Sequence, residues 1–254
     1  ERKYRKEAIY FAMSKERKLR DLQKELQDKT YRSGSYIEFY VFEPKKRLVH
    51  APYIRDKIVQ FSIHTVLQGI YRSVFIKDSY ACIEEKGTHE AVHRIQHYMR
   101  LAQWKYEEPY IVKIDVRKFF YSINRDILKT IYRKKIPESE QDFLWILDMI
   151  VDSSPEGEKG LPLGNVTSQD FANIYLNEFD QEYQKRGVIF VRYADDIVLL
   201  AKSDRAAKRL LETSTKYLEG TLKLKVNQEK SRVVSVFAIR NFKFLGFTLG
   251  KNGK

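Results

Sequence analysis

The chain has 254 residues, of which 43% are hydrophobic and 13% aromatic, so it can bury a substantial core and is not intrinsically disordered. Lysine and arginine number 47 against 34 acidic residues, and the net charge of +13 favours a polyanionic partner such as RNA or DNA. A single cysteine excludes a disulfide framework, and no apolar run reaches the length of a membrane span, so we expect a cytoplasmic protein without a membrane partner.

The first half of the chain has the pattern of helices around one hairpin. Charged residues with leucines at helical spacing predict a surface helix, two short apolar runs around Pro44 predict paired strands, and two further helical periods follow. The segments are 1–35 for the first helix, 37–42 and 47–51 for the strands, and 55–76 and 88–99 for the later helices. Thr88 is the expected N-cap of the last of these.

The second half alternates strands with helices. In chain order we expect a strand at 110–114, helices at 126–133 and 140–151, a loop at 153–164, a helix at 168–186, strands at 188–192 and 197–201, a helix at 204–219, and strands at 233–237 and 242–247. This order predicts an antiparallel-rich sheet backed by helices, and therefore the α+β fold class.

Two adjacent carboxylates separate two of these strands. Asp195 and Asp196 would repel each other unless a cation neutralised them, and Mg²⁺ prefers carboxylate oxygens. Asp115 ends a separate strand, from which it could reach the same ions. Two metals held in this way stabilise the attacking and leaving oxygens of a phosphoryl transfer. Taken alone, the Asp-Asp pair is equally consistent with a plain hairpin turn.

Seven stretches, in order along the chain, resemble the sequence motifs of reverse transcriptases. The string VRYADDIVLLA at 191–201 resembles the motif of the catalytic hairpin. The others are PKKRLVHAPYIRDKIVQ at 44–60, SYACIEEKGTHEA at 79–91, IDVRKFF at 114–120, GLPLGNVTSQDFANIYLN at 160–177, NQEKS at 227–231 and FKFLGF at 242–247. The resemblance covers about residues 37 to 247 and implies an RNA-directed DNA polymerase, which adds dNMP to a primer 3′-OH.

The resemblance implies a role for each motif residue. Asp115, Asp195 and Asp196 would hold two Mg²⁺ ions, for which Mn²⁺ can substitute, and the Val116 carbonyl would add a further oxygen ligand. Lys230 would donate a proton to the pyrophosphate leaving group. The alternative interpretation of Lys230 is a solvated lysine at the start of a strand, without a catalytic role.

Two further motifs would bind the incoming nucleotide. Arg47, assisted by Lys45 or Lys46, would hold the triphosphate, because a guanidinium suits a bidentate phosphate contact. Phe120, beside Phe119, would exclude a 2′-OH and so select dNTPs. The alternative for Phe120 is a core aromatic.

The template motif departs from the common form. Most reverse transcriptases have Gln-Gly and Ser-Pro where this chain has Leu163-Gly164 and Ser168-Gln169, and LGNVTSQ resembles the form of diversity-generating retroelement enzymes. Leu163 offers no hydrogen bond to the nascent base pair, and losing one costs about 1 kcal/mol or more of discrimination, so we expect error-prone copying. Reverse transcriptases of group II introns, retrons and phage-defence systems remain alternatives.

The fold that the resemblance implies is the fingers and palm of a right-hand polymerase, with an RRM-like antiparallel palm sheet. The expected bounds are fingers at 1–105, palm at 106–122, fingers again at 123–167, palm at 168–247, and a link at 248–254 to a thumb that is absent from the sequence. Phe244, Leu245 and Gly246 would form the primer grip. The expected partners are an RNA template, a DNA or RNA primer, dNTPs and a small basic accessory protein that clamps the duplex.

Two other classes of function compete with this interpretation. His89, Glu90 and His93 match the HExxH signature of zinc hydrolases, although only His97 stands out as a further ligand. A non-catalytic RNA-binding module is the second, because 17 tyrosines and 15 phenylalanines are enough to stack bases. Three carboxylates without a metal would repel a phosphate backbone, which argues against that module.

Overall fold

The computed structural model describes residues 6–42, 46–155, 157–239 and 242–250. Its helices are α1 (Lys6–Met13), α2 (Lys15–Gln27), α3 (Ile54–Tyr71), α4 (Thr88–Lys105), α5 (Phe119–Ser122), α6 (Arg125–Arg133), α7 (Gln141–Asp152), α8 (Val166–Lys185) and α9 (Asp204–Gly220). Its strands are β1 (Tyr36–Val41), β2 (Arg47–Pro52), β3 (Tyr110–Asp115), β4 (Phe190–Tyr193), β5 (Asp196–Ala201), β6 (Arg232–Ser235), β7 (Phe242–Phe244) and β8 (Phe247–Leu249). None of the helices in these residues is both long and apolar enough to cross a bilayer.

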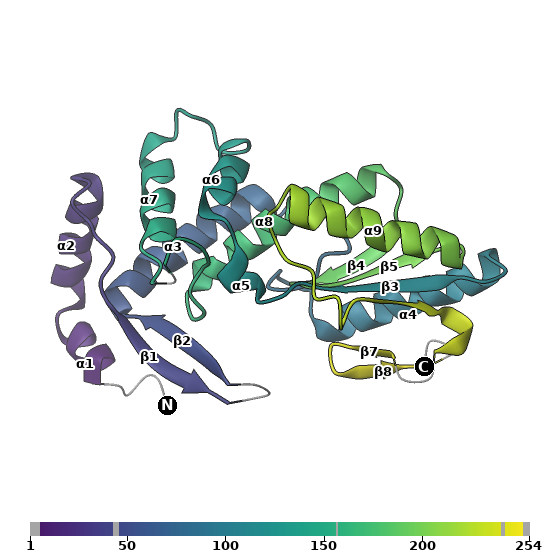
Figure 1. Ribbon diagram of the computed structural model, residues 1–254. Coiled ribbons are helices and arrows are strands. Elements are labelled where there is room, and N and C mark those ends of the chain that lie inside the picture. The colour runs from purple at the N-terminus through teal and green to yellow at the C-terminus, as the bar shows by residue number, and fades with distance from the viewer. Residues whose placement is uncertain (1–5, 43–45, 156, 240–241, 251–254) are drawn as a thin grey trace.

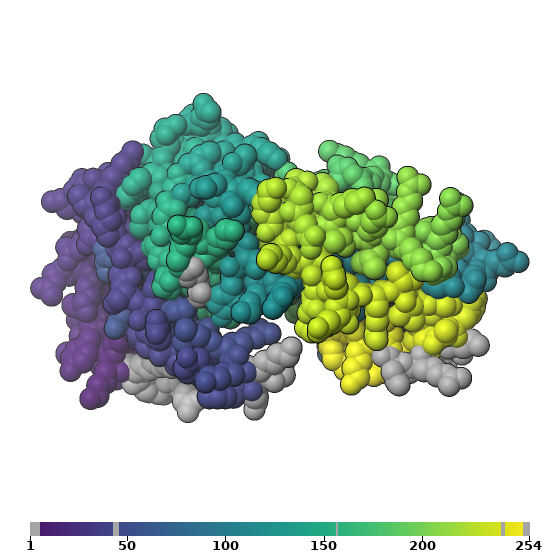
Figure 2. All heavy atoms as spheres, in the orientation of Figure 1, coloured from purple at the N-terminus to yellow at the C-terminus, as the bar shows by residue number. Residues whose placement is uncertain are grey.

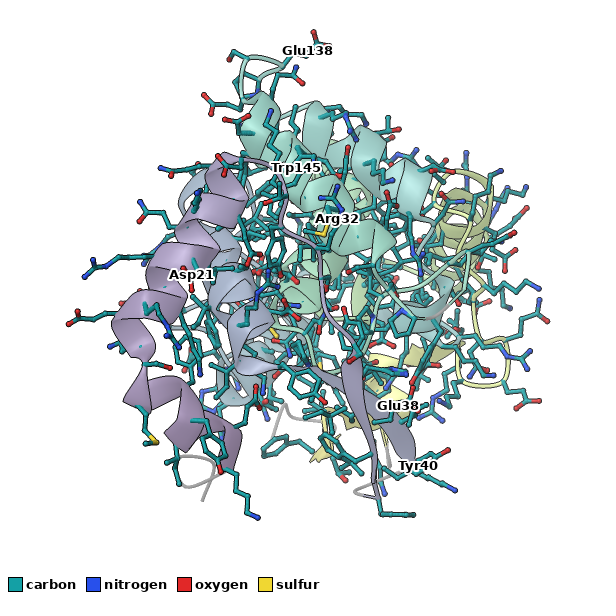
Figure 3. All side chains as sticks on the ribbon, turned by 90° about the vertical axis from the view of Figure 1, so that its left-hand side faces the viewer. Asp21, Arg32, Glu38, Tyr40, Glu138 and Trp145 are labelled. Atoms are coloured by element: carbon teal, nitrogen blue, oxygen red, sulfur yellow. The ribbon has the colours of Figure 1, made fainter. Side chains whose placement is uncertain are left out.

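Two parts of the molecule lie next to each other, as Figure 1 shows. The first holds helices α1, α2, α3, α6 and α7 with the β1–β2 hairpin, and the second holds a four-stranded sheet with α4 and α9. Helix α8 joins them, because it packs on α3 and α6 and also contacts β4 through a buried ion pair. Within the first part, Tyr40 on the hairpin and Glu138 in the α6–α7 connection lie at opposite ends (Figure 3).

The four-stranded sheet has the order β4-β5-β3-β6, and every neighbouring pair is antiparallel. The predicted α+β fold with an antiparallel sheet is therefore confirmed. Strand β5 is apolar at nearly every position because both faces of the sheet are covered. Ile197 and Leu199 pack toward α8 and α9, and Val198 and Leu200 pack toward α4 and the β7–β8 hairpin.

The contact between α3 and α8 also contains polar groups. Asp170 is 3% exposed, accepts a hydrogen bond from Gln68 Nε2 at 2.8 Å, and lies 2.8 Å from His64 Nδ1. Burial raises the pKa of Asp170, and these two partners offset only part of that effect. The buried face of α8 thus fixes its position against α3 by directional contacts as well as by apolar packing.

Several boundaries differ from those expected from the sequence. The N-terminal helical region is two helices with Ser14 between them, and the helix expected at 55–76 ends at Tyr71. Gly87, whose backbone is extended, is the N-cap of α4. Thr88, which was expected to be the cap, is instead the first residue of the helix, and no side-chain hydrogen bond caps this end. The segment expected as one strand at 242–247 is a hairpin, because Leu245 and Gly246 both adopt positive φ and form a two-residue turn.

Candidate active site

Strand register brings two of the three predicted carboxylates together. Asp115 is the last residue of β3, Asp196 is the first of β5, and the two are directly paired in the antiparallel ladder. Directly opposed residues project from the same face of a sheet, with Cβ atoms roughly 5 Å apart. Asp195 lies in the two-residue turn that joins β4 to β5. The sheet therefore brings Asp115 to the same edge as Asp195 and Asp196, which come from a distant part of the sequence.

Ionisation of the Asp195 and Asp196 carboxyl groups is unfavourable in the described structure. Burial, together with the neighbouring charges of Asp115 and Asp196, raises the pKa of Asp195 to about 6, and Arg47 partly opposes the shift. Burial also raises the pKa of Asp196, whereas Lys113 lowers it. A site that disfavours its own negative charges in this way has the electrostatics of a cation site.

Two lysines already contact these carboxylates. Lys113 Nζ is 3.1 Å from Asp196 Oδ1, and Lys230 Nζ is 3.4 Å from Asp115 Oδ2. Within the described residues, no three His, Cys, Asp or Glu side chains converge as a ready-made metal cage. Mg²⁺ is usually bound by one or two carboxylates with water and substrate phosphates, so the oxygen donors present fit it without such a cage.

A cavity of about 860 Å³ opens over the carboxylates. Its lining contains the predicted residues Lys46, Arg47, Asp115, Val116, Phe119, Phe120, Leu163, Asp195, Asp196 and Lys230, and also Leu48, Arg117, Lys118, Tyr121 and Asn227. The surface is indented between the part formed by the β1–β2 hairpin and the part formed by the C-terminal strands (Figure 2). Lys45 lies outside the described residues.

The hairpin and the loop before α8 form another part of the cavity lining. Arg47 begins β2, and the amide of His50 on the same strand donates to the Leu163 carbonyl at 2.7 Å. Gly164 has φ +117°, and a Cβ there would lie 2.6 Å from the His50 carbonyl oxygen. Glycine is therefore required for this close approach, which sets Leu163 and Arg47 on one wall. Gly164 itself lines a neighbouring cavity.

The two phenylalanines after β3 have different surroundings. Phe119 is 3% exposed and belongs to the core, whereas Phe120 is half-buried. Their rings contact edge to face with centroids 5.5 Å apart. The short helix α5, which the sequence did not predict, holds both rings at the cavity.

The lysine segment runs along the end of β3. The Asn227 amide donates to the Asp115 carbonyl at 2.8 Å, and Ser231 Oγ accepts from the Asp115 amide at 3.1 Å. These bonds place Lys230 beside Asp115, although its side chain is 51% exposed. Lys230 therefore lies close to the carboxylates and in contact with solvent.

The C-terminal hairpin lies on the same sheet face as Asp196 and does not line the cavity. Phe244 is fully buried against the α4 side of the sheet, and Leu245 and Gly246 form the turn. The Lys243 carbonyl accepts a hydrogen bond from Lys113 Nζ at 3.1 Å, which links the hairpin to the site.

Lys113 is a site residue that the sequence analysis missed. Its position two residues before Asp115 in a strand was the available signal, because such residues share a face.

Comparison with known proteins identifies the family. The family described as "Reverse transcriptase (RNA-dependent DNA polymerase)" matches residues 42–249, which is most of the chain. The chain belongs to this reverse transcriptase family.

Similar proteins include a group II intron-encoded protein and a retron reverse transcriptase. Protein YkfC from Escherichia coli K12 is 26% identical over 247 aligned residues, covering 81% of this chain and 63% of YkfC. The group II intron-encoded protein LtrA from Lactococcus lactis is 24% identical over 228 residues, covering 86% of this chain and 36% of LtrA. The retron Ec73 reverse transcriptase from Escherichia coli is 28% identical over 137 residues, covering 50% of this chain and 43% of that protein. The chain thus spans less than two thirds of each relative.

Solved structures show the same fold at low identity. Telomerase from Candida tropicalis, in complex with the TWJ fragment of telomeric RNA, aligns with a TM-score of 0.66 and 14% identity over 92% of this chain and 47% of that chain. Apo telomerase from the same organism gives a TM-score of 0.66 over 87% of this chain and 48% of that one. The chain has the fingers and palm of the polymerase fold, as the sequence predicted.

The competing interpretations lose their structural basis in the described residues. His89 and His93 are exposed on α4, and the His89 ring packs against Phe247 with centroids 5.3 Å apart; no further ligand joins the HExxH residues. The palm sheet is covered on both faces, so it presents no open aromatic face of the kind that stacks RNA bases in an RRM.

Proposed function

We propose that this protein is an RNA-directed DNA polymerase that adds dNMP to a primer 3′-OH along an RNA template. The observation that carries the proposal is that Asp115, Asp195 and Asp196 line one cavity together with Arg47. That geometry suits a triphosphate held between a guanidinium and metal-binding carboxylates. Family membership and the RNA-bound telomerase of similar fold support it.

Each residue then has a chemical task. Asp115, Asp195 and Asp196, with the Val116 carbonyl, would hold two Mg²⁺ ions, which when bound lower the barrier by stabilising the attacking and leaving oxygens. Arg47 pairs with the triphosphate from the fingers side, and Phe120 packs against the sugar where a 2′-OH would project. Lys230 is close enough to Asp115 to deliver a proton to the leaving pyrophosphate.

We assign residues 106–122 and 168–247 to the palm and residues 1–105 and 123–167 to the fingers. The four-stranded sheet and the helix–hairpin part support most of this division, whereas α4, which falls within 1–105, packs on the sheet. The Phe244–Gly246 turn is assigned to primer contact. Its link to the site through Lys113 and the Lys243 carbonyl supports that role.

Primer extension tests the activity. With a defined RNA template, a DNA primer, dNTPs and Mg²⁺, Asp195→Asn is expected to lower incorporation at least about 100-fold, because a metal ligand is lost. Asp142→Asn is the matched control, since Asp142 is exposed on α7 and pairs with Lys29 at 2.7 Å. Equal activity of the two variants would refute the metal assignment. A folded wild-type chain that extends no primer would refute the polymerase proposal for this chain.

The finer assignment, to the error-prone enzymes of diversity-generating retroelements, rests on Leu163 and the Ser168-Gln169 pair. Leu163 lines the cavity with an aliphatic side chain where the common form has glutamine. Sequencing of extension products is expected to show errors concentrated opposite template adenines, and fewer errors in Leu163→Gln. Faithful copying by the wild type would favour the intron, retron or phage-defence classes, and the similarity to LtrA and retron Ec73 supports the first two of these.

A further inference from the structure

A fully buried arginine lies two residues before the Ala194–Asp195 turn. Arg192 on β4 and Asp180 on α8 are both 0% exposed. The guanidinium donates from Nε and Nη2 to the two oxygens of Asp180 at 2.6–2.9 Å. Nη1 donates to Asn173 Oδ1 at 3.1 Å and to the carbonyl of Ala194 at 3.1 Å. Because Asp180 and Asn173 hold the guanidinium from α8, the Nη1 donor has a fixed direction.

The carbonyl that Arg192 holds belongs to a strained residue. Ala194 has φ +52°, a left-handed conformation that L-residues with a Cβ rarely adopt. Its carbonyl is part of the peptide bond that leads into Asp195. The bond from Nη1 therefore fixes the plane of that peptide, and with it the direction in which the Asp195 side chain leaves the turn.

The network extends beyond α8. The backbone amide of Arg192 donates to the Asp78 carbonyl at 2.9 Å, and its carbonyl accepts from the Tyr80 amide at 3.0 Å. Asn173 Nδ2 donates to the Ala81 carbonyl at 2.8 Å. The segment from Asp78 to Ala81 thus holds both Arg192 and its partner Asn173. Neither can shift without breaking bonds in a second part of the chain.

We propose that Arg192 is a positioning residue, which holds the Ala194–Asp195 peptide in its strained form and so sets the Asp195 carboxylate relative to Asp115 for metal binding. This inference rests on the proposed polymerase function. A packing role alone makes a different prediction: any replacement of the Arg192–Asp180 pair that restores stability would also restore metal binding.

The double variant Arg192→Met/Asp180→Leu separates the two roles. Replacing a buried ion pair by apolar side chains of similar volume is often neutral for stability, whereas removing one partner is not. The double variant is therefore expected to keep a cooperative thermal transition near that of the wild type while lacking the donor to Ala194. The control is Arg133→Met/Asp148→Leu, which removes in the same way a partly exposed ion pair between α6 and α7, outside the site.

Two measurements are made on each protein. The first is the affinity for Mn²⁺ without substrate, measured from the electron paramagnetic resonance signal of free Mn²⁺. This affinity is expected to fall at least about tenfold in the Arg192 double variant and to be unchanged in the control. In primer extension, the Mg²⁺ concentration for half-maximal rate is expected to rise by a similar factor, with the KM for dNTP nearly unchanged. Wild-type metal affinity in a folded double variant would overturn the proposal.

If the double variant loses its cooperative thermal transition, Arg192→Lys tests the proposal in its place. Lysine keeps a charge opposite Asp180, but its single ammonium lacks the fork that reaches both Asp180 and the Ala194 carbonyl. Its metal affinity is expected to fall in the same direction, and wild-type affinity would overturn the proposal. Failure of the polymerase proposal is recognised separately, because the wild type and the control would then both lack incorporation.

Discussion

Lys113 lies between Asp196 and the C-terminal hairpin, with its Nζ 3.1 Å from Asp196 Oδ1 and 3.1 Å from the Lys243 carbonyl oxygen. Its side chain is 16% exposed and that of Asp196 is 25% exposed, so water screens this ion pair only in part. Lys113 thus offsets a carboxylate charge in the site and also anchors the hairpin assigned to primer contact.

Lys113→Met is expected to lower the free energy of unfolding by about 1–3 kcal/mol, because the Asp196 carboxylate loses its partner. Mg²⁺ is expected to restore part of this loss by compensating the same charge. Urea denaturation with and without Mg²⁺ measures both effects. In an Asp196→Asn background the loss should shrink, since the amide carries no charge. An equal loss in the two backgrounds would show that only the hairpin anchor matters.

Phe120→Ala is expected to lower the preference for dNTPs over rNTPs at least about tenfold, because the ring that would meet a 2′-OH is removed. The measurement is kcat/KM for a matched pair of deoxy and ribo substrates. Phe119→Ala is the control: its buried ring should cost about 3–5 kcal/mol of stability without changing sugar selection. Unaltered selection in Phe120→Ala would make that ring a packing residue instead.

Arg47→Ala is expected to raise the KM for dNTPs about 10- to 100-fold with a smaller change in kcat, because hydrogen bonds to charged groups contribute about 1.5–3 kcal/mol. Lys46 also lines the cavity, but its Nζ lies 4.3 Å from the centroid of the Tyr40 ring, so Lys46→Ala should change KM by no more than about threefold. Steady-state kinetics over a range of dNTP concentrations measures both. Similar effects of the two variants would contradict a specific role for Arg47.

Gly164→Ala is expected to cost at least about 2 kcal/mol of stability, because alanine strains the backbone at φ +117° and its Cβ would meet the His50 carbonyl oxygen at 2.6 Å. Relief of that clash would push β2 away from the Leu163 loop and raise the KM for dNTPs. Gly69→Ala is the control, since Gly69 lies within α3 and a Cβ there meets nothing within 4 Å. It should stabilise the protein by about 0.5–1 kcal/mol, as measured by thermal or urea unfolding. A neutral Gly164→Ala would show that the loop adapts freely.

Much of the fold and of the site follows from local sequence pattern. Period-two and helical apolar spacing predicted most strands and helices, because neighbouring residues alone determine which face of an element is apolar. The same patterns placed Asp115 at a strand end and Asp195 at a turn, whereas Asp196, expected in that turn, is the first residue of β5 because it pairs with Tyr193 and Asp115 in the ladder. The motif resemblance added Arg47, Phe120, Leu163 and Lys230, all of which line the cavity.

Other features depend on which segments meet in space. A local stretch of sequence does not show which residues become partners in the fold. Examples are the pairing of Asp115 with Asp196, the contacts of Lys113, and the burial of Arg192 against Asp180. The β7–β8 hairpin was expected as one strand, because a Leu-Gly turn inside an apolar run carries little local signal. Local pattern determines which elements form and which of their faces are apolar. The site needed tertiary structure, because strand register and buried charge pairing are long-range interactions, whose energies depend on distance and burial in the folded chain.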